Sequence, residues 1–132
     1  MNLEIIKIAS FNKNNRKLVN STHSSKNKNP ICGDEIELNI RMNNGKIVDF
    51  GYIGKSCVYC HASASIISRI LKNENQKNVK KILSLGENFY KGKEVFLPKK
   101  WIKLKILFNK KNFNRKECIY LPFKSLTSAL KL

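Results

Sequence analysis

The stretch Glu35-Ile36-Glu37-Leu38-Asn39-Ile40-Arg41-Met42-Asn43-Asn44-Gly45 decides how the chain folds. Apolar and polar residues alternate as far as Met42, which predicts a strand with one buried face. The Asn-Gly pair that follows tolerates the positive φ that a tight hairpin turn demands. The sequence therefore predicts a second, antiparallel strand over residues 46–55. Within it, Gly51 and Gly54 predict a bulge or a close approach of the backbone.

Helical spacing of apolar residues dominates the rest of the chain. A run of small residues followed by isoleucines predicts a helix over residues 62–71, and a further helix ends at Gly86. The remaining expected segments are a short helix over 3–11, a polar connection over 12–29 with an extended piece near 18–19, a short piece near 89–90, a helix over 99–108, a basic loop over 109–114 and a terminal helix over 122–131. Pro122 suits the first turn of that terminal helix.

These elements predict an α+β fold, with a small antiparallel sheet and helices packed on one face. The chain has 132 residues, so we expect residues 1–132 to form a single domain with one core.

The net charge of +17 raises the question of nucleic-acid binding. Lysine supplies nearly all of this charge, whereas the recognition of bases and phosphates favours arginine. The lysines are also spread along the chain among many asparagines. We therefore expect the charge to favour solubility and association with an acidic protein, and we do not expect nucleic acid to be a partner.

The chain has neither an apolar run of about 20 residues, as a membrane span requires, nor a convincing secretory signal. We therefore expect a cytoplasmic protein with no membrane partner. In a reducing compartment, its four cysteines indicate metal or sulfur chemistry rather than disulfides.

Three of the cysteines lie at expected boundaries of regular structure. Cys32 precedes the first hairpin strand and is followed by Gly33-Asp34, Cys57 lies at the start of a helix, and Cys118 comes just before the terminal helix. A helix N-terminus stabilises a thiolate, so we expect a lowered pKa for Cys57. Thiolates at turns beside a carboxylate are typical of a site for a soft metal ion, and Asp34 is the fourth candidate ligand.

Two motifs now point to a family. Asn29-Pro30-Ile31-Cys32-Gly33-Asp34, the strand-turn-strand, and Cys57 followed by Ala62-Ser63-Ala64-Ser65 together resemble the NifU/IscU-type iron–sulfur cluster scaffold family. The long segment between Cys57 and Cys118 is similar to the insertion of the SufU-type branch. Arg115, and the absence of both a Leu-Pro-Pro-Val-Lys segment and a histidine beside Cys118, agree with that branch.

The resemblance implies a three-stranded antiparallel sheet with helices, and a metal site made of Cys32, Asp34, Cys57 and Cys118. It implies that a cysteine desulfurase delivers sulfur as a persulfide, with Cys118 as its acceptor. A 2Fe–2S or related cluster would form there and pass to apo iron–sulfur acceptor or carrier proteins. In the SufU-type alternative, Zn²⁺ occupies these ligands and the protein is a sulfurtransferase that activates the desulfurase. Whether the chain counts as an enzyme therefore stays open.

The sequence departs from the family pattern at three places. Ser56 stands where a glycine usually precedes the second ligand cysteine, and the N-terminal helix lacks the usual histidine and Pro-Arg features. Cys60 is an additional cysteine. We expect it to be a small buried residue, but a second redox thiol or an all-sulfur ligand set remains open. A thioredoxin-like reading of Cys57-x-x-Cys60 lacks the surrounding βαβ pattern.

Overall fold

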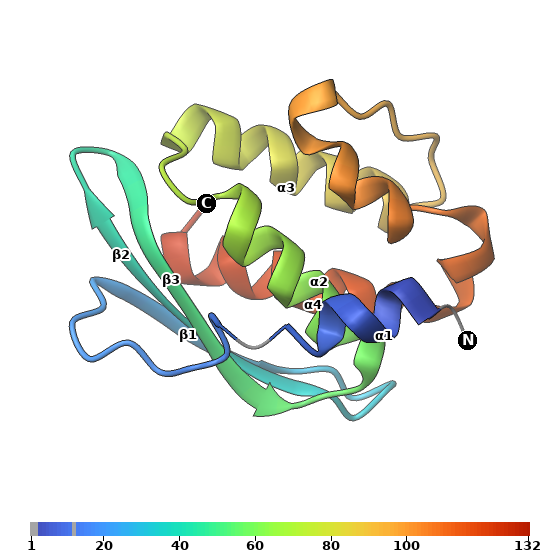
Figure 1. Ribbon diagram of the computed structural model, residues 1–132, viewed down its shortest axis with the longest axis horizontal. Coiled ribbons are helices and arrows are strands. Elements are labelled where there is room, and N and C mark those ends of the chain that lie inside the picture. Colours follow the sequence, from blue (N-terminus) through green and yellow to red (C-terminus); the bar gives the residue numbers. More distant parts are fainter. Residues whose placement is uncertain (1–2, 12) are drawn as a thin grey trace.

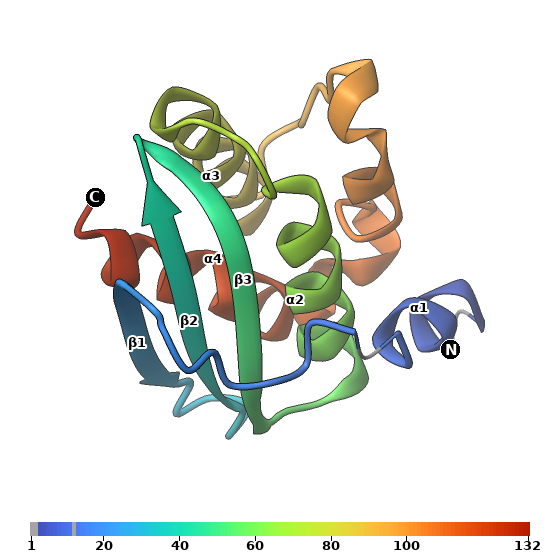
Figure 2. The same ribbon diagram turned by 60° about the vertical axis from the view of Figure 1, so that its left-hand side comes forward.

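The computed structural model describes residues 3–11 and 13–132, so Met1, Asn2 and Asn12, the first residue of the expected connection, lie outside it. Its sheet has the antiparallel order β1-β2-β3. Helices α2, α3 and α4 lie on one side of this sheet (Figures 1 and 2). The elements are α1 (Leu3–Ala9), β1 (His23–Lys28), β2 (Glu35–Asn43), β3 (Lys46–Lys55), α2 (Val58–Ile70), α3 (Gln76–Tyr90), the 3-10 helices η1 (Lys99–Ile106) and η2 (Lys110–Arg115), and α4 (Lys116–Leu130). The α+β prediction is confirmed.

The predicted hairpin is present with the expected buried face. Ile36, Leu38 and Ile40 of β2 are almost fully buried, and the turn residues Asn44 and Gly45 have φ values of 51° and 75°. The bulge lies at Arg41–Met42 rather than at the glycines of β3.

Those two glycines mark close approaches of the backbone instead. A Cβ on Gly51 would collide with the carbonyl oxygen of Arg16, and one on Gly54 would collide with that of Glu35. The segment that contains Arg16 therefore packs directly on β3. The Leu18 N–H of the same segment donates to Asn39 Oδ1 at 3.2 Å, which accounts for the burial of this polar side chain in β2.

Strand β1 lies outside the stretch where the sequence predicted an extended segment. That piece was expected near residues 18–19, whereas β1 begins at His23 and consists of polar residues. Its pairing with β2 fixes it, and Ser25 Oγ also donates to the Ser125 carbonyl of α4 at 2.6 Å. Backbone pairing and contact with α4, rather than an apolar pattern, therefore define this strand.

Three predicted helix boundaries are wrong by about a turn or more. Helix α2 begins at Val58 rather than at residue 62. Helix α3 continues through Gly86 to Tyr90, because this glycine is a packing position: a Cβ there would lie 2.6 Å from Phe123 Cδ1. Helix α4 begins at Lys116, so Pro122 is inside it and Cys118 is in its first turn rather than before it. Pro122 has no N–H to donate to the Cys118 carbonyl, yet the helix continues.

The segment between α3 and α4 also differs from expectation. Residues 99–106 form a 3-10 helix rather than an α-helix, and the expected basic loop contains the 3-10 helix η2. Trp101, Leu104 and Leu107 belong to the core, whereas Ile102 is 48% exposed. Across the part of the chain that the structure describes, no helix has the length and apolar character needed to cross a membrane.

The small residues of α2 bring this helix against α4. Ala62, Ser63, Ala64 and Ser65 are fully buried, and Ser63 Oγ donates to the Ile119 carbonyl at 2.7 Å. Small side chains permit such a close contact between helices. The contact fixes the N-terminus of α2 beside the first turn of α4, where Cys118 lies.

Candidate metal centre

The register of the sheet brings two cysteine-bearing segments to the same end. Lys28 pairs with Glu35, and Glu35 pairs with Lys55, so β1 ends, β2 begins and β3 ends side by side. The turn that carries Cys32 and the turn that carries Cys57 leave the sheet at this end. The contact between α2 and α4 adds the first turn of α4, with Cys118.

The structure places three of the four predicted ligands in one compact group, and the fourth, Cys57, lies beside it. Ligand atoms of Cys32, Asp34 and Cys118 all lie within 4.8 Å of one another. Cys57 adjoins them, because its N–H donates to Asp34 Oδ1 at 3.1 Å and its thiol shares a hydrogen bond with that of Cys118.

The second carboxylate oxygen of Asp34 has an unusual environment. Asp34 is only 7% exposed, and its Oδ2 is buried without a hydrogen-bond partner among the described residues. A buried, unpaired carboxylate oxygen is costly unless a cation or a donor approaches it. Three thiols and this oxygen form a donor set that suits zinc or iron. The residues therefore fit a metal ion or an iron–sulfur cluster.

The expected lowering of the Cys57 pKa is wrong. Cys57 is the N-cap residue of α2, but burial raises the pKa of its thiol, and the nearby Asp34 carboxylate adds to the rise. Burial and the neighbouring Cys57 thiol likewise raise the pKa of Cys118. Desolvation outweighs the helix terminus because it disfavours the charged thiolate. A bound metal ion would supply the positive charge that deprotonation of these thiols requires.

The loop around Cys32 is shaped by Asn29. Its Oδ1 accepts the N–H groups of Ile31 and Cys32 at 2.8 and 3.2 Å, and its carbonyl accepts the Gly33 N–H at 2.7 Å. Gly33 has a φ of 77°, which glycine adopts without strain. The Asn-Pro-x-Cys-Gly-Asp motif is therefore a tight turn that presents Cys32 and Asp34 together.

Glu117 joins three segments around the site, a role that the sequence reasoning missed. Its Oε2 accepts from Asn29 Nδ2 at 2.9 Å, and its Oε1 accepts from the Tyr90 hydroxyl at 2.7 Å. Glu117 precedes Cys118, so it ties α3 and the Cys32 loop to the first turn of α4. The hydrogen bond to Glu117 raises the pKa of Tyr90. The one signal in the sequence was that Glu117 stands beside Cys118 where the family has a histidine.

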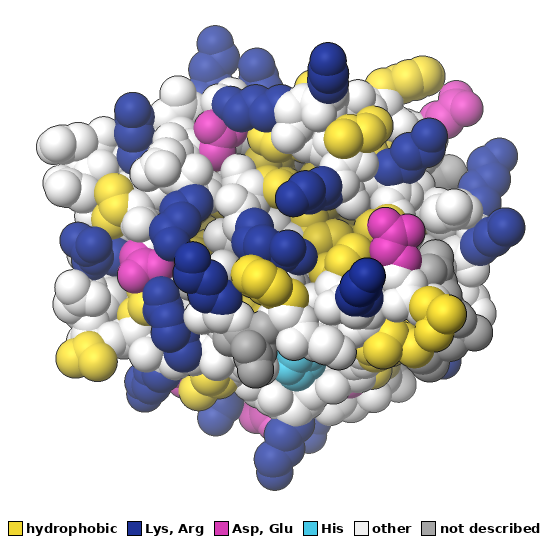
Figure 3. Space-filling view, in the orientation of Figure 1, with side chains coloured by type: hydrophobic (Ala, Val, Ile, Leu, Met, Phe, Trp, Pro, Cys, Tyr) yellow, Lys and Arg dark blue, Asp and Glu magenta, His cyan; other side chains and the backbone are white. Residues whose placement is uncertain are grey.

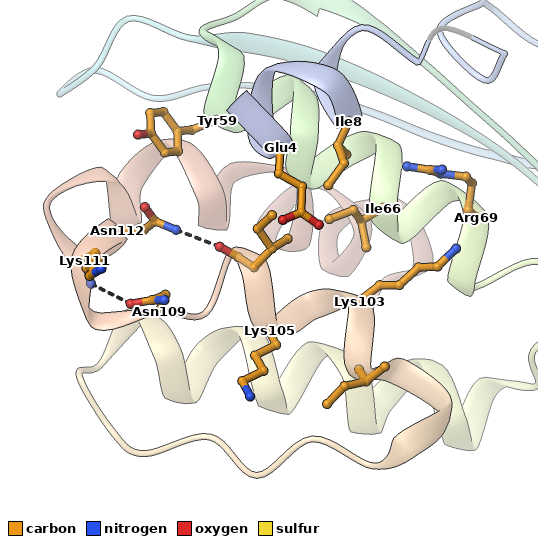
Figure 4. Close-up of a pocket in the computed structure, with 12 residues that line it drawn as sticks. Glu4, Ile8, Tyr59, Ile66, Arg69, Lys103, Lys105, Asn109, Lys111 and Asn112 are labelled. Carbon is orange, nitrogen blue, oxygen red and sulfur yellow. Dashed lines mark hydrogen bonds between the residues drawn. The ribbon is translucent and has the colours of Figure 1, made fainter. Parts of the chain in front are cut away.

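A separate cavity of about 780 Å³ lies between α1, α2, η1 and η2 (Figure 4). Its floor includes Ile8 and Ile66, while Arg69, Lys103 and Lys105 lie around it. No cysteine lines it, so it is distinct from the metal centre.

Comparison with known proteins identifies the family. Residues 6–97 match the family described as NifU-like N terminal domain. The chain belongs to this family. Among curated NifU-like proteins, the iron–sulfur cluster assembly scaffold protein IscU of Thermotoga maritima is 30% identical over 128 residues, which cover 96% of this chain and 89% of that protein.

Other NifU-like relatives include both functional alternatives. The zinc-dependent sulfurtransferase SufU of Bacillus subtilis is 25% identical over 83 residues, covering 63% of this chain and 56% of that protein. A solved structure of an assembly scaffold candidate for the SUF system, FiSufU of Fervidobacterium islandicum, superposes with a TM-score of 0.85 at 26% identity and covers 98% of this chain and 96% of its own. A NifU-like N-terminal structure from Brucella abortus has a TM-score of 0.84 at 16% identity, covers 98% of this chain and 91% of its own, and shows the shared fold.

Proposed function

We propose that this NifU-like protein is an iron–sulfur cluster assembly scaffold, on which sulfur and iron combine before the product passes to an apo-protein. The observation that supports this most is the trio of Cys32, Asp34 and Cys118, with ligand atoms within 4.8 Å of one another. Asp34 Oδ2 is buried there and has no hydrogen-bond partner in the part of the chain that the structure describes. The similarity to the IscU of Thermotoga maritima agrees with it.

The four residues have different tasks in this proposal. Cys32, Cys57 and Cys118 bind iron through sulfur, and Asp34 supplies a harder and weaker oxygen ligand. A site with one weak ligand releases its cargo more readily than a site with four thiolates. Asp34 thus favours assembly and transfer over permanent storage.

Sulfur reaches the site from a cysteine desulfurase in this proposal, and Cys118 accepts it as a persulfide. Cys118 is only 3% exposed, so the first turn of α4 has to open for the acceptor thiol to meet its donor. Pro122 favours such opening, because it leaves the carbonyl of Cys118 without its i+4 helical hydrogen bond.

Analysis of metal and acid-labile sulfide in anaerobically purified protein tests the proposal. We expect iron and sulfide in equal amounts after reconstitution, and a marked loss of both in Cys32→Ala and in Cys118→Ala. Lys77→Ala, on the exposed surface of α3, is the matched control and retains both. The proposal fails if the two cysteine variants bind as much metal as the unchanged protein.

The second candidate function is a zinc-dependent sulfurtransferase that activates the desulfurase. The similarity to the SufU of Bacillus subtilis favours it, and so does the set of three thiols and one carboxylate, which suits tetrahedral Zn²⁺. Bound zinc would stabilise the thiolate that attacks a persulfide.

A desulfurase assay separates the two functions. Faster alanine release from cysteine, with zinc retained throughout, supports the sulfurtransferase. A visible-absorbing cluster that moves to an apo-ferredoxin supports the scaffold.

A further inference from the structure

Cys57 and Cys60 have the placement of a redox-active dithiol. Cys57 is the N-cap of α2 with extended backbone angles, and Cys60 lies in the first helical turn, three residues later. The Cys57 side chain therefore stands at the N-terminus of the helix, beside the turn that carries Cys60. An N-cap side chain lies beside the first helical turn, which holds the residue three positions later, so a small local adjustment can bring the two sulfurs to disulfide distance.

The thiols of Cys57 and Cys60 differ in solvent exposure, as a redox-active dithiol requires. Cys57 is partly exposed and adjoins the ligand trio, whereas Cys60 is fully buried behind it. Neither Cys57 nor Cys60 belongs to the compact trio within the described residues, and the proposed function gives the Cys60 thiol no task.

Polar groups connect Cys60 to the surface. Its sulfur accepts a hydrogen bond from the Ser56 hydroxyl, and Ser56 Oγ lies 2.6 Å from His61 Nδ1. Burial raises the pKa of the Cys60 thiol, and the Ser56 hydroxyl opposes that rise because a hydroxyl donor stabilises the negative charge that develops on a reacting sulfur. His61 is half-buried, so the chain from Cys60 through Ser56 ends at a side chain in contact with solvent.

We propose that Cys60 is a resolving thiol that reduces persulfide sulfur on Cys57 and releases it as hydrogen sulfide inside the assembly site. This inference rests on the proposed function, because it assumes that sulfur arrives as a persulfide. Such sulfur is two electrons more oxidised than the sulfide of a cluster. A dithiol beside the ligands supplies those two electrons where the cluster forms.

The reaction balances with groups of this chain. Sulfur first moves from Cys118 to the hydrogen-bonded Cys57, when the Cys57 thiol attacks the outer persulfide sulfur and Cys118 leaves as a thiol. Cys60 sulfur then attacks the inner sulfur of the Cys57 persulfide. A Cys57–Cys60 disulfide forms, the persulfide S–S bond breaks, and the outer sulfur leaves as hydrogen sulfide with the proton from Cys60. An external dithiol reductant restores both thiols by exchange.

Cys60 suits this step better than Cys32 or Cys118 does. If either of those thiols resolved the persulfide, the resulting disulfide would remove two ligands from the centre. A disulfide with Cys60 engages one ligand, Cys57, and leaves the compact trio reduced. Iron can therefore still bind Cys32, Asp34 and Cys118 while the dithiol is being restored.

A single-turnover experiment on the full chain tests the proposal. Metal-free, fully reduced protein is treated anaerobically with glutathione persulfide, freed of the reagent, and assayed for released sulfide and by mass spectrometry. Trypsin places Cys57 and Cys60 in the peptide 56–69, Cys118 in 117–124 and Cys32 in 29–41. The location of any disulfide is therefore unambiguous.

We expect close to one sulfide per persulfide, and a peptide 56–69 that has lost two hydrogens. Cys60→Ala should keep its persulfide and release at least about tenfold less sulfide, because the thiol that the proposal assigns to resolve the Cys57 persulfide is gone. Cys60→Ser is the second variant in case alanine perturbs the core. Undiminished sulfide release from folded Cys60 variants, or a disulfide that joins peptides 56–69 and 117–124, would overturn the proposal.

Metal binding separates this inference from the proposed function. Cys60→Ala should bind iron as well as the unchanged protein does, because Cys60 is not a ligand. If it binds normally and also releases sulfide normally, the scaffold function stands and the dithiol proposal fails. If the unchanged protein binds no metal, the scaffold function fails whatever Cys60 does.

Discussion

At the scale of single residues, the two oxygens of Asp34 have separate surroundings. Oδ1 accepts the Cys57 N–H, which holds one ligand loop to the other, while Oδ2 is buried with no hydrogen-bond partner in residues 3–11 and 13–132. One oxygen therefore organises the protein, and the other is available to the cargo of the proposed scaffold. A carboxylate can change its coordination and accept a proton, so in that proposal it gives the cargo a route out that a thiolate does not.

Asp34→Ala should therefore lengthen the life of a cluster once it has formed. We expect the visible absorbance of the reconstituted variant to decay several-fold more slowly in the presence of a chelator. Reconstitution under strictly anaerobic conditions followed by timed spectra measures this. Faster decay than in the unchanged protein would show that Asp34 holds the centre rather than helping to release it.

Glu117 acts on the site through Asn29 and Tyr90, because none of its hydrogen bonds described above involves a ligand atom. Glu117→Gln keeps its size but weakens the charge-assisted bonds to Asn29 and Tyr90. We expect zinc to bind about tenfold more weakly, as is common when a group that orients ligands is lost. The Tyr90 pKa should also fall towards its ordinary value, because its hydrogen bond to the carboxylate is what raises it.

Competition with a chromophoric chelator and ultraviolet titration of tyrosine measure these two effects. Glu94→Gln, in the exposed segment after α3, is the matched control. Unchanged zinc affinity in Glu117→Gln would mean that the Cys32 loop does not need this anchor.

At the scale of elements, the sequence predicts those parts whose pattern is local. Alternation and an Asn-Gly turn predicted β2 and β3 with their buried face, and motif residues marked every candidate ligand. Strand β1 could not be found this way, because its polar residues are fixed by pairing with β2 and by the bond from Ser25 to α4. Gly86 and Pro122 led to wrong helix boundaries for a similar reason. Contact with the Phe123 ring explains the glycine inside α3, and the packing of α4 keeps that helix continuous through the proline.

Asp49 of β3 connects three elements. Its Oδ1 accepts from Arg16 at 3.1 Å and from the Phe50 N–H at 2.9 Å, and Lys72 beyond α2 lies 3.9 Å away. Burial by itself raises the pKa of Asp49, but these donors and charges more than offset it and hold the pKa below its ordinary value of 3.8. The ionised group therefore stabilises the fold at neutral pH.

Asp49→Asn should cost about 0.5–1 kcal/mol at pH 7, since the partners are partly exposed. A carboxyl with a lowered pKa in the folded state contributes stability above its unfolded pKa, and this is lost as the pH falls through the folded pKa. Thermal unfolding of both proteins should therefore differ at neutral pH and converge below the ordinary value of 3.8. A constant difference across the acid range would show that the charge of Asp49 is not the cause.

At the scale of the whole molecule, positive charge is dispersed. The 26 lysines and arginines outnumber the 9 acidic residues, and Figure 3 shows basic side chains scattered over the visible face rather than gathered into one stripe. A surface of this kind attracts any polyanion through counterion release, but with only four arginines the chain offers few of the bidentate contacts that read base edges. The same charge would favour encounter with an acidic desulfurase or acceptor.

Duplex DNA should therefore bind weakly and without sequence preference. Because counterion release dominates, we expect the affinity to fall by about a thousandfold between 50 and 200 mM salt. Fluorescence anisotropy with two unrelated duplexes measures both properties. The double variants Lys77→Glu/Lys81→Glu on α3 and Lys103→Glu/Lys105→Glu on η1 change the net charge equally, so they should weaken binding equally. Salt-resistant affinity, or a loss confined to one pair, would reveal a built nucleic-acid site and contradict the view that the charge serves encounter with acidic proteins.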